Sequence, residues 1–302
     1  MKGFLDEIGK QLAGRWVSLL TIPGLLFLVT AAAAWSLGHT MDFPRVEDRL
    51  RQVAADYSRP PAALVLAALV VLALATFSGI LVHGLSVVIE EFWLTPWTHW
   101  PASLLLRRRR RRWARAHWRY RRADQRRERA QFAGRTHAAG LHARTAVRQT
   151  ARRNRIATTR PCHAGWMADR LSSCGQRVMG QYGLDLDMVW PRLWLLLPEP
   201  ARDDVRAARD RLSQACSLAA WGVLYFVLGC AWWYPVALGG AVTGFLAWTR
   251  ARRAVQTLAD LIESSMDVYS ALLAEHLGVP LPNGYVTPAI GASLRERIRK
   301  GA

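Results

Sequence analysis

The sequence predicts an all-α chain, a polytopic helical membrane protein with four transmembrane helices and a helical, partly disordered cytoplasmic region. Three observations support this fold class. Long uncharged apolar runs occur along the chain, tryptophans stand near the ends of these runs, and one arginine-rich segment carries almost all of the net charge. Apolar runs of about 20 residues match the thickness of bilayer hydrocarbon, and tryptophan is enriched at membrane–water interfaces.

The first predicted span covers residues 16–37, an uncharged run of 22 residues. Trp16 and Trp35 lie 19 residues apart, which is about 28 Å along a helix and places one indole at each interface. A cleavable signal peptide is the alternative, but the apolar region of such a peptide is usually only about 7–15 residues long. We therefore predict an uncleaved anchor, preceded at 1–15 by an amphipathic leader on the cytoplasmic surface.

Three further spans are predicted at 62–88, 215–233 and 235–249, and residues 38–61 form the external connection after the first span. The last two spans form a hairpin that turns at Trp233. Both are short for a full crossing, so a re-entrant hairpin is the alternative interpretation. We favour the full crossing and thus four spans.

Arginine placement sets the predicted orientation, because cytoplasmic loops are enriched in Arg and Lys. Arginine clusters lie close to span ends in three segments, 89–160, 161–214 and 250–302, whereas the connection at 38–61 balances four arginines with four acidic residues. We therefore predict a multi-pass protein of the cell inner (cytoplasmic) membrane with both termini in the cytoplasm.

The basic charge of the chain is concentrated in one stretch. Between Arg107 and Arg160 there are 20 arginines against Asp124 and Glu128, so this stretch contributes +18 of the total +19. Such a local excess indicates a phosphate-bearing partner, on lipid headgroups or on nucleic acid. A third interpretation is a topology determinant in a flexible loop.

Anionic phospholipid is the partner that we favour for this stretch. It begins soon after a predicted membrane exit, and Trp113, Trp118 and Tyr120 are interleaved with the arginines, as suits an interface. No RNA- or DNA-binding motif surrounds it, so nucleic acid is the less favoured partner. The predicted lipid- or phosphate-binding residues are Arg107, Arg108, Arg109, Arg110, Arg111, Arg112, Arg115, Arg119, Arg121 and Arg122.

The cytoplasmic region is predicted to be helical in parts. Residues 104–132 lack proline and glycine and predict a helix, but arginine all round it leaves no apolar stripe for burial. Residues 133–159 are predicted to be mobile. The segment 255–273 carries an apolar stripe at helical spacing, which needs a partner helix. That partner is either the helix predicted at 200–214 or a second subunit.

The second span carries a set of polar residues at helical spacing. Gly79, His83, Ser86 and Glu90 fall on one face near its cytoplasmic end. One hypothesis is a proton- or ion-conducting path through His83, Ser86 and Glu90, which makes an oligomeric channel or transporter the alternative function. The other interpretation places His83 among the headgroups and the remaining two in the cytoplasm.

Small residues predict close helix packing in the last two spans. Gly240 and Gly244 form a GxxxG pattern, and Gly222 and Gly229 lie seven residues apart in the preceding span. Glycine lets membrane helices approach closely, so these residues predict a tight hairpin or an oligomer contact.

No sequence motif indicates catalysis. A nucleophile elbow, a P-loop, an HExxH motif and a kinase signature are all missing, so no catalytic residue, metal or cofactor is predicted. A zinc site at Cys162, His163 and Cys174 has a spacing unlike the common fingers, and reduced, unpaired thiols are favoured instead.

The predicted function is therefore that of a non-enzymatic integral membrane protein, which binds anionic lipid and anchors or organises a membrane assembly. Its predicted partners are anionic phospholipids, with a homo-oligomer and a cytoplasmic protein as further candidates. A membrane tether for nucleic acid is the third hypothesis.

Overall fold

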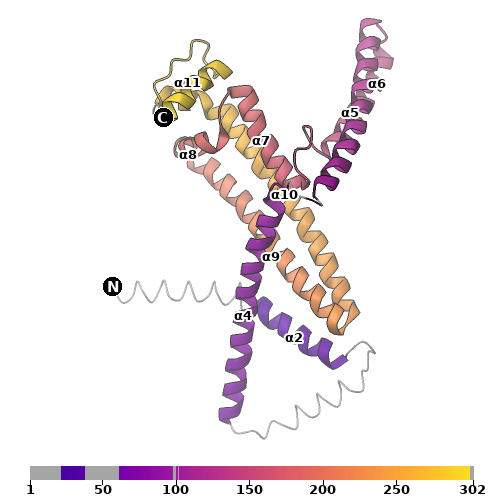
Figure 1. Cartoon of the computed structure of the whole chain (residues 1–302), viewed down its shortest axis with the longest axis vertical. Coiled ribbons are helices and arrows are strands. Elements are labelled where there is room, and N and C mark those ends of the chain that lie inside the picture. Colours follow the sequence, from indigo (N-terminus) through magenta and orange to yellow (C-terminus); the bar gives the residue numbers. More distant parts are fainter. Residues whose placement is uncertain (1–21, 38–60, 98–99, 101, 300–302) are drawn as a thin grey trace. The chain divides into compact units, whose positions relative to one another are not determined.

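The computed structural model describes residues 22–37, 61–97, 100 and 102–299. Every regular element in this part of the chain is a helix, which confirms the all-helical class (Figure 1). The predicted leader, the first residues of the first span and almost all of the predicted external connection lie outside the described residues.

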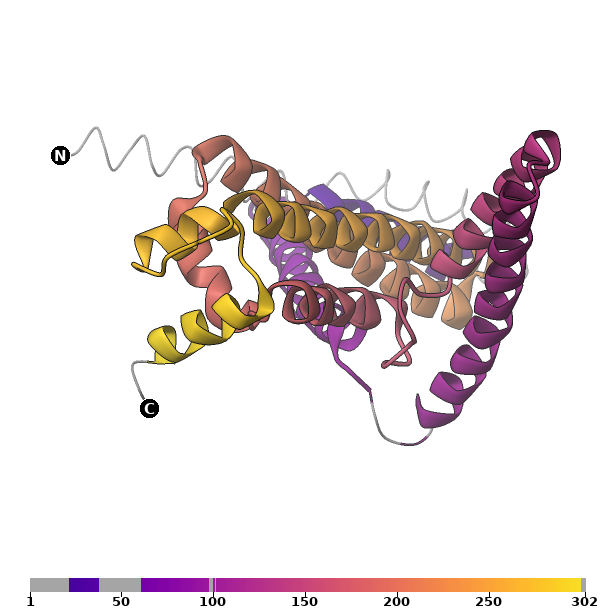
Figure 2. The same cartoon turned by 90° about the horizontal axis from the view of Figure 1, so that it is seen from above.

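The chain divides into two compact units. Unit 1 consists of residues 1–91 and 213–251, and unit 2 consists of residues 92–212 and 252–302. Two long helices contribute to both units. Both are drawn in Figures 1 and 2. They are α9 (Glu199–Trp232) and α10 (Tyr234–His276), and only Trp233 separates them.

Unit 1 contains α2 (Ile22–Leu37), most of α4 (Pro61–Leu94), and the apolar parts of α9 and α10. Its helices are rich in Leu, Val and Ala, and their charged residues are confined to the ends. Helix α2 contacts α4 closely, because a Cβ on Gly24 would collide with the α4 backbone and lie 2.8 Å from the Ser78 hydroxyl.

Aromatic side chains join α2 to α9 in unit 1. The ring of Phe27 lies 5.9 Å from that of Trp221 and 5.4 Å from that of Tyr225. Further along, Trp35 stacks on Trp232 with the ring centroids 5.8 Å apart. Offset stacked and edge-to-face pairs of this kind stabilise beyond their buried area, so they fix α2 against α9.

Two helices of the described chain are long and apolar enough to cross a membrane, namely Val65–Leu94 and Glu199–Trp232. Ile22–Trp35 is apolar but shorter. The uncharged part of α10 ends before Arg250, so it covers about 24 Å at 1.5 Å per residue. The structure thus supports two spans by length and composition, and the predicted four-span topology stays a prediction.

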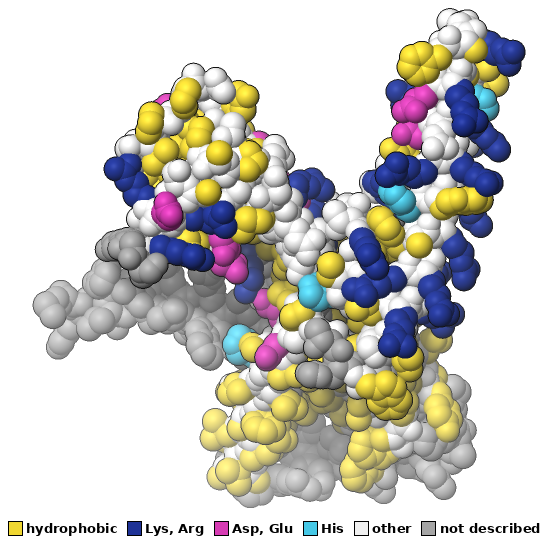
Figure 3. Space-filling view, turned by 45° about the horizontal axis from the view of Figure 1, so that its top comes forward, with side chains coloured by type: hydrophobic (Ala, Val, Ile, Leu, Met, Phe, Trp, Pro, Cys, Tyr) yellow, Lys and Arg dark blue, Asp and Glu magenta, His cyan; other side chains and the backbone are white. Residues whose placement is uncertain are grey.

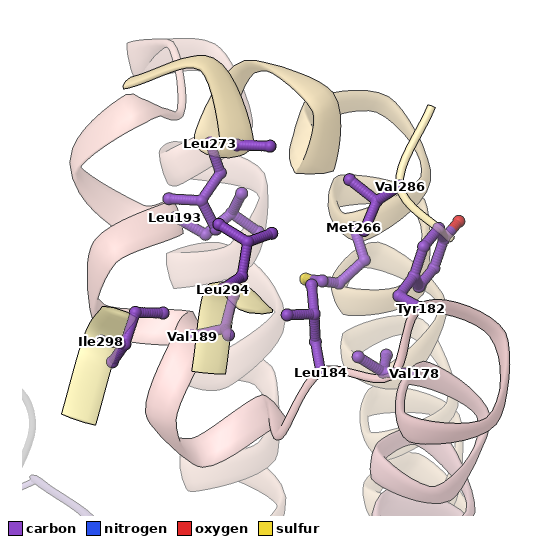
Figure 4. Close-up of a cluster of buried hydrophobic side chains, with 11 residues drawn as sticks. Val178, Tyr182, Leu184, Val189, Leu193, Met266, Leu273, Val286, Leu294 and Ile298 are labelled. Atoms are coloured by element: carbon purple, nitrogen blue, oxygen red, sulfur yellow. The ribbon is translucent and has the colours of Figure 1, made fainter. Parts of the chain in front are cut away.

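Unit 2 has a compact core that α10 and three shorter helices build. These helices are α7 (Trp166–Tyr182), α8 (Leu186–Leu196) and α11 (Pro288–Arg299). Figure 4 shows the buried side chains that meet there, which are Val178, Tyr182, Leu184, Val189, Leu193, Met266, Leu273, Ala274, Val286, Leu294 and Ile298.

The apolar stripe predicted at 255–273 finds its partners within the chain. Leu258 packs with Val205 and Ala208 of α9, and Met266 and Leu273 belong to the core of unit 2. The first of the two predicted alternatives, the helix near 200–214, is therefore correct, and α8 and α11 complete the cover.

A buried ion network ties α7 to α10. The Arg170 side chain is 3% exposed and donates to Asp260 and Glu263, at 2.7 Å in each case. Arg177 also pairs with Glu263. A buried guanidinium needs such compensation, because desolvation of an unpaired charge costs several kcal/mol.

Candidate phosphate-binding hairpin

The arginine-rich stretch folds as a helical hairpin. Its two helices, α5 (Ala102–Phe132) and α6 (Thr136–Asn154), pack against each other, and Gly134 in the turn adopts a left-handed φ of 67°. The prediction of a mobile segment at 133–159 is corrected here, because α6 occupies most of it. Helix α6 contains five alanines before Arg152, and alanine has the highest helix propensity.

Small side chains form the contact between the two helices. We call it the alanine seam, and it comprises Ala116, Ala123, Ala130, Ala139 and Ala146, of which all but half-buried Ala116 are buried. Members on each helix recur every seven residues, the spacing that keeps one face toward an antiparallel neighbour. The expectation that α5 has no stripe for burial is therefore wrong, since the stripe consists of alanine.

Most of the predicted arginines point away from this seam. Of the ten candidates, eight are exposed: Arg107, Arg108, Arg111, Arg112, Arg115, Arg119, Arg121 and Arg122. Figure 3 shows basic side chains along the whole length of the hairpin. The Arg122 guanidinium lies 3.6 Å from the centre of the half-exposed Trp118 ring, a cation–π contact that holds both side chains at the surface.

One continuous line of arginines follows the outer face of α5. We call it the α5 row, and its members recur every three or four residues and are all exposed: Arg108, Arg111, Arg115, Arg119, Arg122, Arg126 and Arg129. The row extends for about 32 Å along the helix axis. No carboxylate of the described chain pairs with any member.

Arg109 and Arg110 do not belong to this exposed set. Arg109 donates to the carbonyl oxygens of Ile156 (2.6 Å), His163 (2.8 Å) and Gly165 (2.9 Å). Arg110 Nε donates to the Pro161 carbonyl at 2.9 Å. Both guanidiniums thus hold the loop that follows α6.

A buried carboxylate completes the anchor of that loop. Asp169 pairs with Arg109 at 3.0 Å and accepts from the backbone N–H groups of Cys162 (2.7 Å) and His163 (3.2 Å). Burial lowers the pKa of Arg109 from its ordinary value and Asp169 opposes this shift, so the guanidinium remains charged. The sequence contained a signal for this inward position of Arg109. Arg109 lies seven residues from both Ala102 and Ala116, so it shares a helix face with them.

His117 is the titratable group at the centre of the hairpin. Its ring stacks on Trp113 with centroids 4.7 Å apart, and its Nδ1 is buried without a hydrogen-bond partner in the described structure. Burial first, and then the charges of Arg153 and Arg121, lower the pKa of His117 below 6.5. This shift favours the neutral imidazole.

The residues of the predicted polar path all lie on α4 at helical spacing, but they differ in exposure. His83 is exposed, whereas Ser86 is buried and its hydroxyl donates to the backbone carbonyl of His83 at 2.7 Å. Glu90 is half-buried. The buried face of this helix consists instead of Ala75, Ser78, Gly79, Val82 and Ser86.

The predicted packing glycines lie where α9 meets α10 in unit 1. A Cβ on Gly222 would stand 2.8 Å from the backbone nitrogen of Gly244, and one on Gly240 would stand 2.8 Å from the Gly222 carbonyl. A Cβ on Gly229 would collide with the backbone of Ala237. At Gly244 itself an added Cβ meets nothing within 4 Å.

Within the described residues, no group of three His, Cys, Asp or Glu side chains could hold a metal ion, and all four cysteines are free. Burial, together with Glu263, raises the pKa of the Cys174 thiol to about 12, so it is protonated at neutral pH. Comparison of the chain with protein-family models, curated proteins and solved structures found no match.

Proposed function

We propose that this chain is a non-enzymatic, multi-pass protein of the cytoplasmic membrane that binds anionic phospholipid through the α5–α6 hairpin. In doing so it anchors or organises a membrane assembly. The observation that carries the proposal is the α5 row, an exposed line of guanidiniums that no carboxylate of the described chain neutralises. Anionic lipid headgroups attract basic segments that lie close to a membrane.

The surface of unit 1 supports the membrane location. Large apolar side chains face outward on α4, with Val65, Leu69 and Phe77 between 57% and 64% exposed. The most apolar window of this helix is only 22% buried, so it is unlike the core helix of a soluble protein. Exposed apolar area costs about 25 cal/mol per Å² in water, and bilayer hydrocarbon removes that cost.

The proposed topology has four spans and cytoplasmic termini. Stacking of Trp35 on Trp232 puts two indoles beside the turn at Trp233, as expected for helix ends at the external interface. Arg250, at the other end of the apolar part of α10, then lies on the cytoplasmic side, as the positive-inside rule requires.

Lipid is favoured over nucleic acid for the α5 row because of its aromatic residues and its attachment. Trp113 is half-buried in the hairpin and donates to the Ala157 carbonyl at 3.0 Å, so it cannot offer a base-stacking face. Trp118 is exposed but carries Arg122 on its ring. Each basic residue close to an anionic surface contributes about 1 kcal/mol, so the row suffices for binding without base contacts.

Lipid selectivity in the bilayer tests this proposal. The full chain is reconstituted in phosphatidylcholine vesicles, and the motionally restricted fraction of spin-labelled phosphatidylglycerol is compared with that of spin-labelled phosphatidylcholine. We expect a severalfold preference for phosphatidylglycerol, and we expect R108Q/R111Q/R115Q/R122Q to lose most of it. The matched lysine variant keeps the charge and should keep the preference. Equal association of both lipids with the unmodified chain would contradict the proposal.

A further inference from the structure

Helix α6 carries a second line of arginines, separate from the α5 row. We call it the α6 row, and its members are Arg144, Arg148 and Arg152 together with the C-cap residue Arg155, spaced by four, four and three residues. All four side chains are exposed, and no carboxylate of the described chain pairs with them. The row extends for about 16 Å along the hairpin.

The two rows point in opposite directions. On α6 the row lies opposite Ala139 and Ala146 of the seam. On α5 the row lies opposite Tyr120 and Asp124, which line one pocket together with Ala146, Thr150 and Asn154 of α6. Helix axes that pack through small residues are about 8 Å apart, and each helix has a radius of about 5–6 Å with its side chains. The outer edges of the hairpin are therefore about 20 Å apart.

This separation means that one flat surface cannot neutralise both rows. The Debye length at physiological ionic strength is about 8 Å, less than half of the distance between the two edges. A phosphate layer bound along one edge therefore leaves the charge of the other edge available. The hairpin has the geometry of a two-sided connector rather than that of a one-sided anchor.

Resting on the proposed function, we propose that the α6 row is a second phosphate-binding surface, through which the hairpin bridges its own membrane to a second anionic bilayer. The neighbours of the α6 row favour a bilayer over nucleic acid. Leu141 is 53% exposed and Val147 69% exposed, and aliphatic side chains enter the headgroup region but do not stack on bases. Phe132, at the end of the hairpin, is 92% exposed and supplies a further group for insertion.

Vesicle docking by the full chain tests the bridge. The chain is reconstituted either in phosphatidylglycerol-containing donor vesicles or in purely phosphatidylcholine donors, and labelled phosphatidylglycerol-containing acceptor vesicles are added. Co-flotation of the two populations measures docking. In anionic donors one row is held by the donor membrane, so docking needs the other. In phosphatidylcholine donor vesicles neither arginine row is occupied by the donor membrane, so either row can bind the acceptor vesicle.

The decisive variant is R144Q/R148Q/R152Q/R155Q. In anionic donors we expect it to dock at least about tenfold fewer acceptor vesicles, since each lost arginine removes about 1 kcal/mol of surface binding. In neutral donors it should still dock through the α5 row. The matched variant R144K/R148K/R152K/R155K should dock like the unmodified chain in both donors, and equal helicity by circular dichroism controls for folding.

The outcomes separate the two proposals. Docking from neutral donors but not from anionic donors would overturn the bridge and leave lipid binding intact. Absence of docking from both donors would overturn lipid binding itself. Docking that disappears after nuclease treatment would overturn the bilayer as the second partner and identify nucleic acid in its place.

Discussion

Two helical hairpins of this chain pack through small residues in the same way but differ in the residues on their outer surfaces. The α9–α10 hairpin packs through Gly222, Gly229 and Gly240, and the α5–α6 hairpin packs through the alanine seam. Outside, the first presents side chains such as Val223 and Phe245, and the second presents arginine. The comparison teaches that small residues on the inner face bring two helices together in either setting. The outer residues alone then determine whether the surface suits hydrocarbon or phosphate.

The largest expected effect separates inner from outer arginines on α5. Arg109→Ala leaves Asp169 buried without its partner and should destabilise unit 2 by about 3–5 kcal/mol. Its neighbour Arg108 is exposed and unpaired in the described chain, so Arg108→Ala should change stability by less than about 0.5 kcal/mol. Chemical denaturation in mild detergent, followed by circular dichroism, measures both. Equal losses from the two variants would show that the inner and outer positions do not differ.

The next effect distinguishes the two glycines of the GxxxG pattern in α10. Gly240→Ala forces a Cβ into the α9 backbone at Phe226, and such overpacking should cost about 1–3 kcal/mol. Gly244→Ala places its Cβ in open space and should be neutral or stabilise by up to about 1 kcal/mol, because alanine is the better helix former. Thermal unfolding in detergent compares the two. If Gly244→Ala loses as much stability as Gly240→Ala, the prediction that Gly240 but not Gly244 lacks room for a Cβ is wrong.

The smallest effect concerns pH and belongs to the α5–α6 hairpin. The pKa of His117 is lowered from 6.5 in the folded chain by burial, Arg153 and Arg121. Below pH 6.5 the unfolded chain takes up this proton before the folded hairpin does, so acidification should reduce stability in that window. Well above pH 6.5, where neither the folded nor the unfolded chain carries this proton, the residue should contribute no pH dependence.

Substitution isolates this contribution. We measure the midpoint temperature of thermal unfolding between pH 7.5 and 5. For His117→Gln this temperature should fall less steeply with acidification than it does for the unmodified chain. His137→Gln, at an exposed position on α6, is the matched control and should leave the slope unchanged. If the unfolding temperature depends on pH equally in all three proteins, His117 does not cause the loss of stability at low pH.

Much of this architecture is readable from the sequence. The length and proline-free composition of 104–132 predicted α5, and the apolar stripe at 255–273 indicated the partner that it has on α9. The six consecutive arginines from Arg107 hid the inward role of Arg109, because composition does not distinguish neighbours of the same type. Only the seven-residue spacing from the alanines distinguishes Arg109 from its neighbours. Alanine is easily overlooked as a core residue when larger aliphatic side chains are sought.

Helix α6 was missed for a related reason. Its alanines, threonines and single glycine resemble a mobile linker when the segment is considered alone, and like-charge repulsion opposes an isolated helix. The alanine seam with α5 supplies the tertiary contacts that an isolated segment lacks. Helices of this length depend on packing more than on propensity, so the second helix becomes visible only together with the first.

The seven-residue repeat of the seam restricts how this stretch can change in length during evolution. Insertion of one residue in the middle of α5 would turn everything beyond it by about 100°, bringing arginines into the seam and alanines to the surface. Insertion or deletion of seven residues turns it by only about 20° and preserves both faces. Length variation among descendants of this chain should therefore occur in whole heptads, matched on α5 and α6, or at the turn around Gly134.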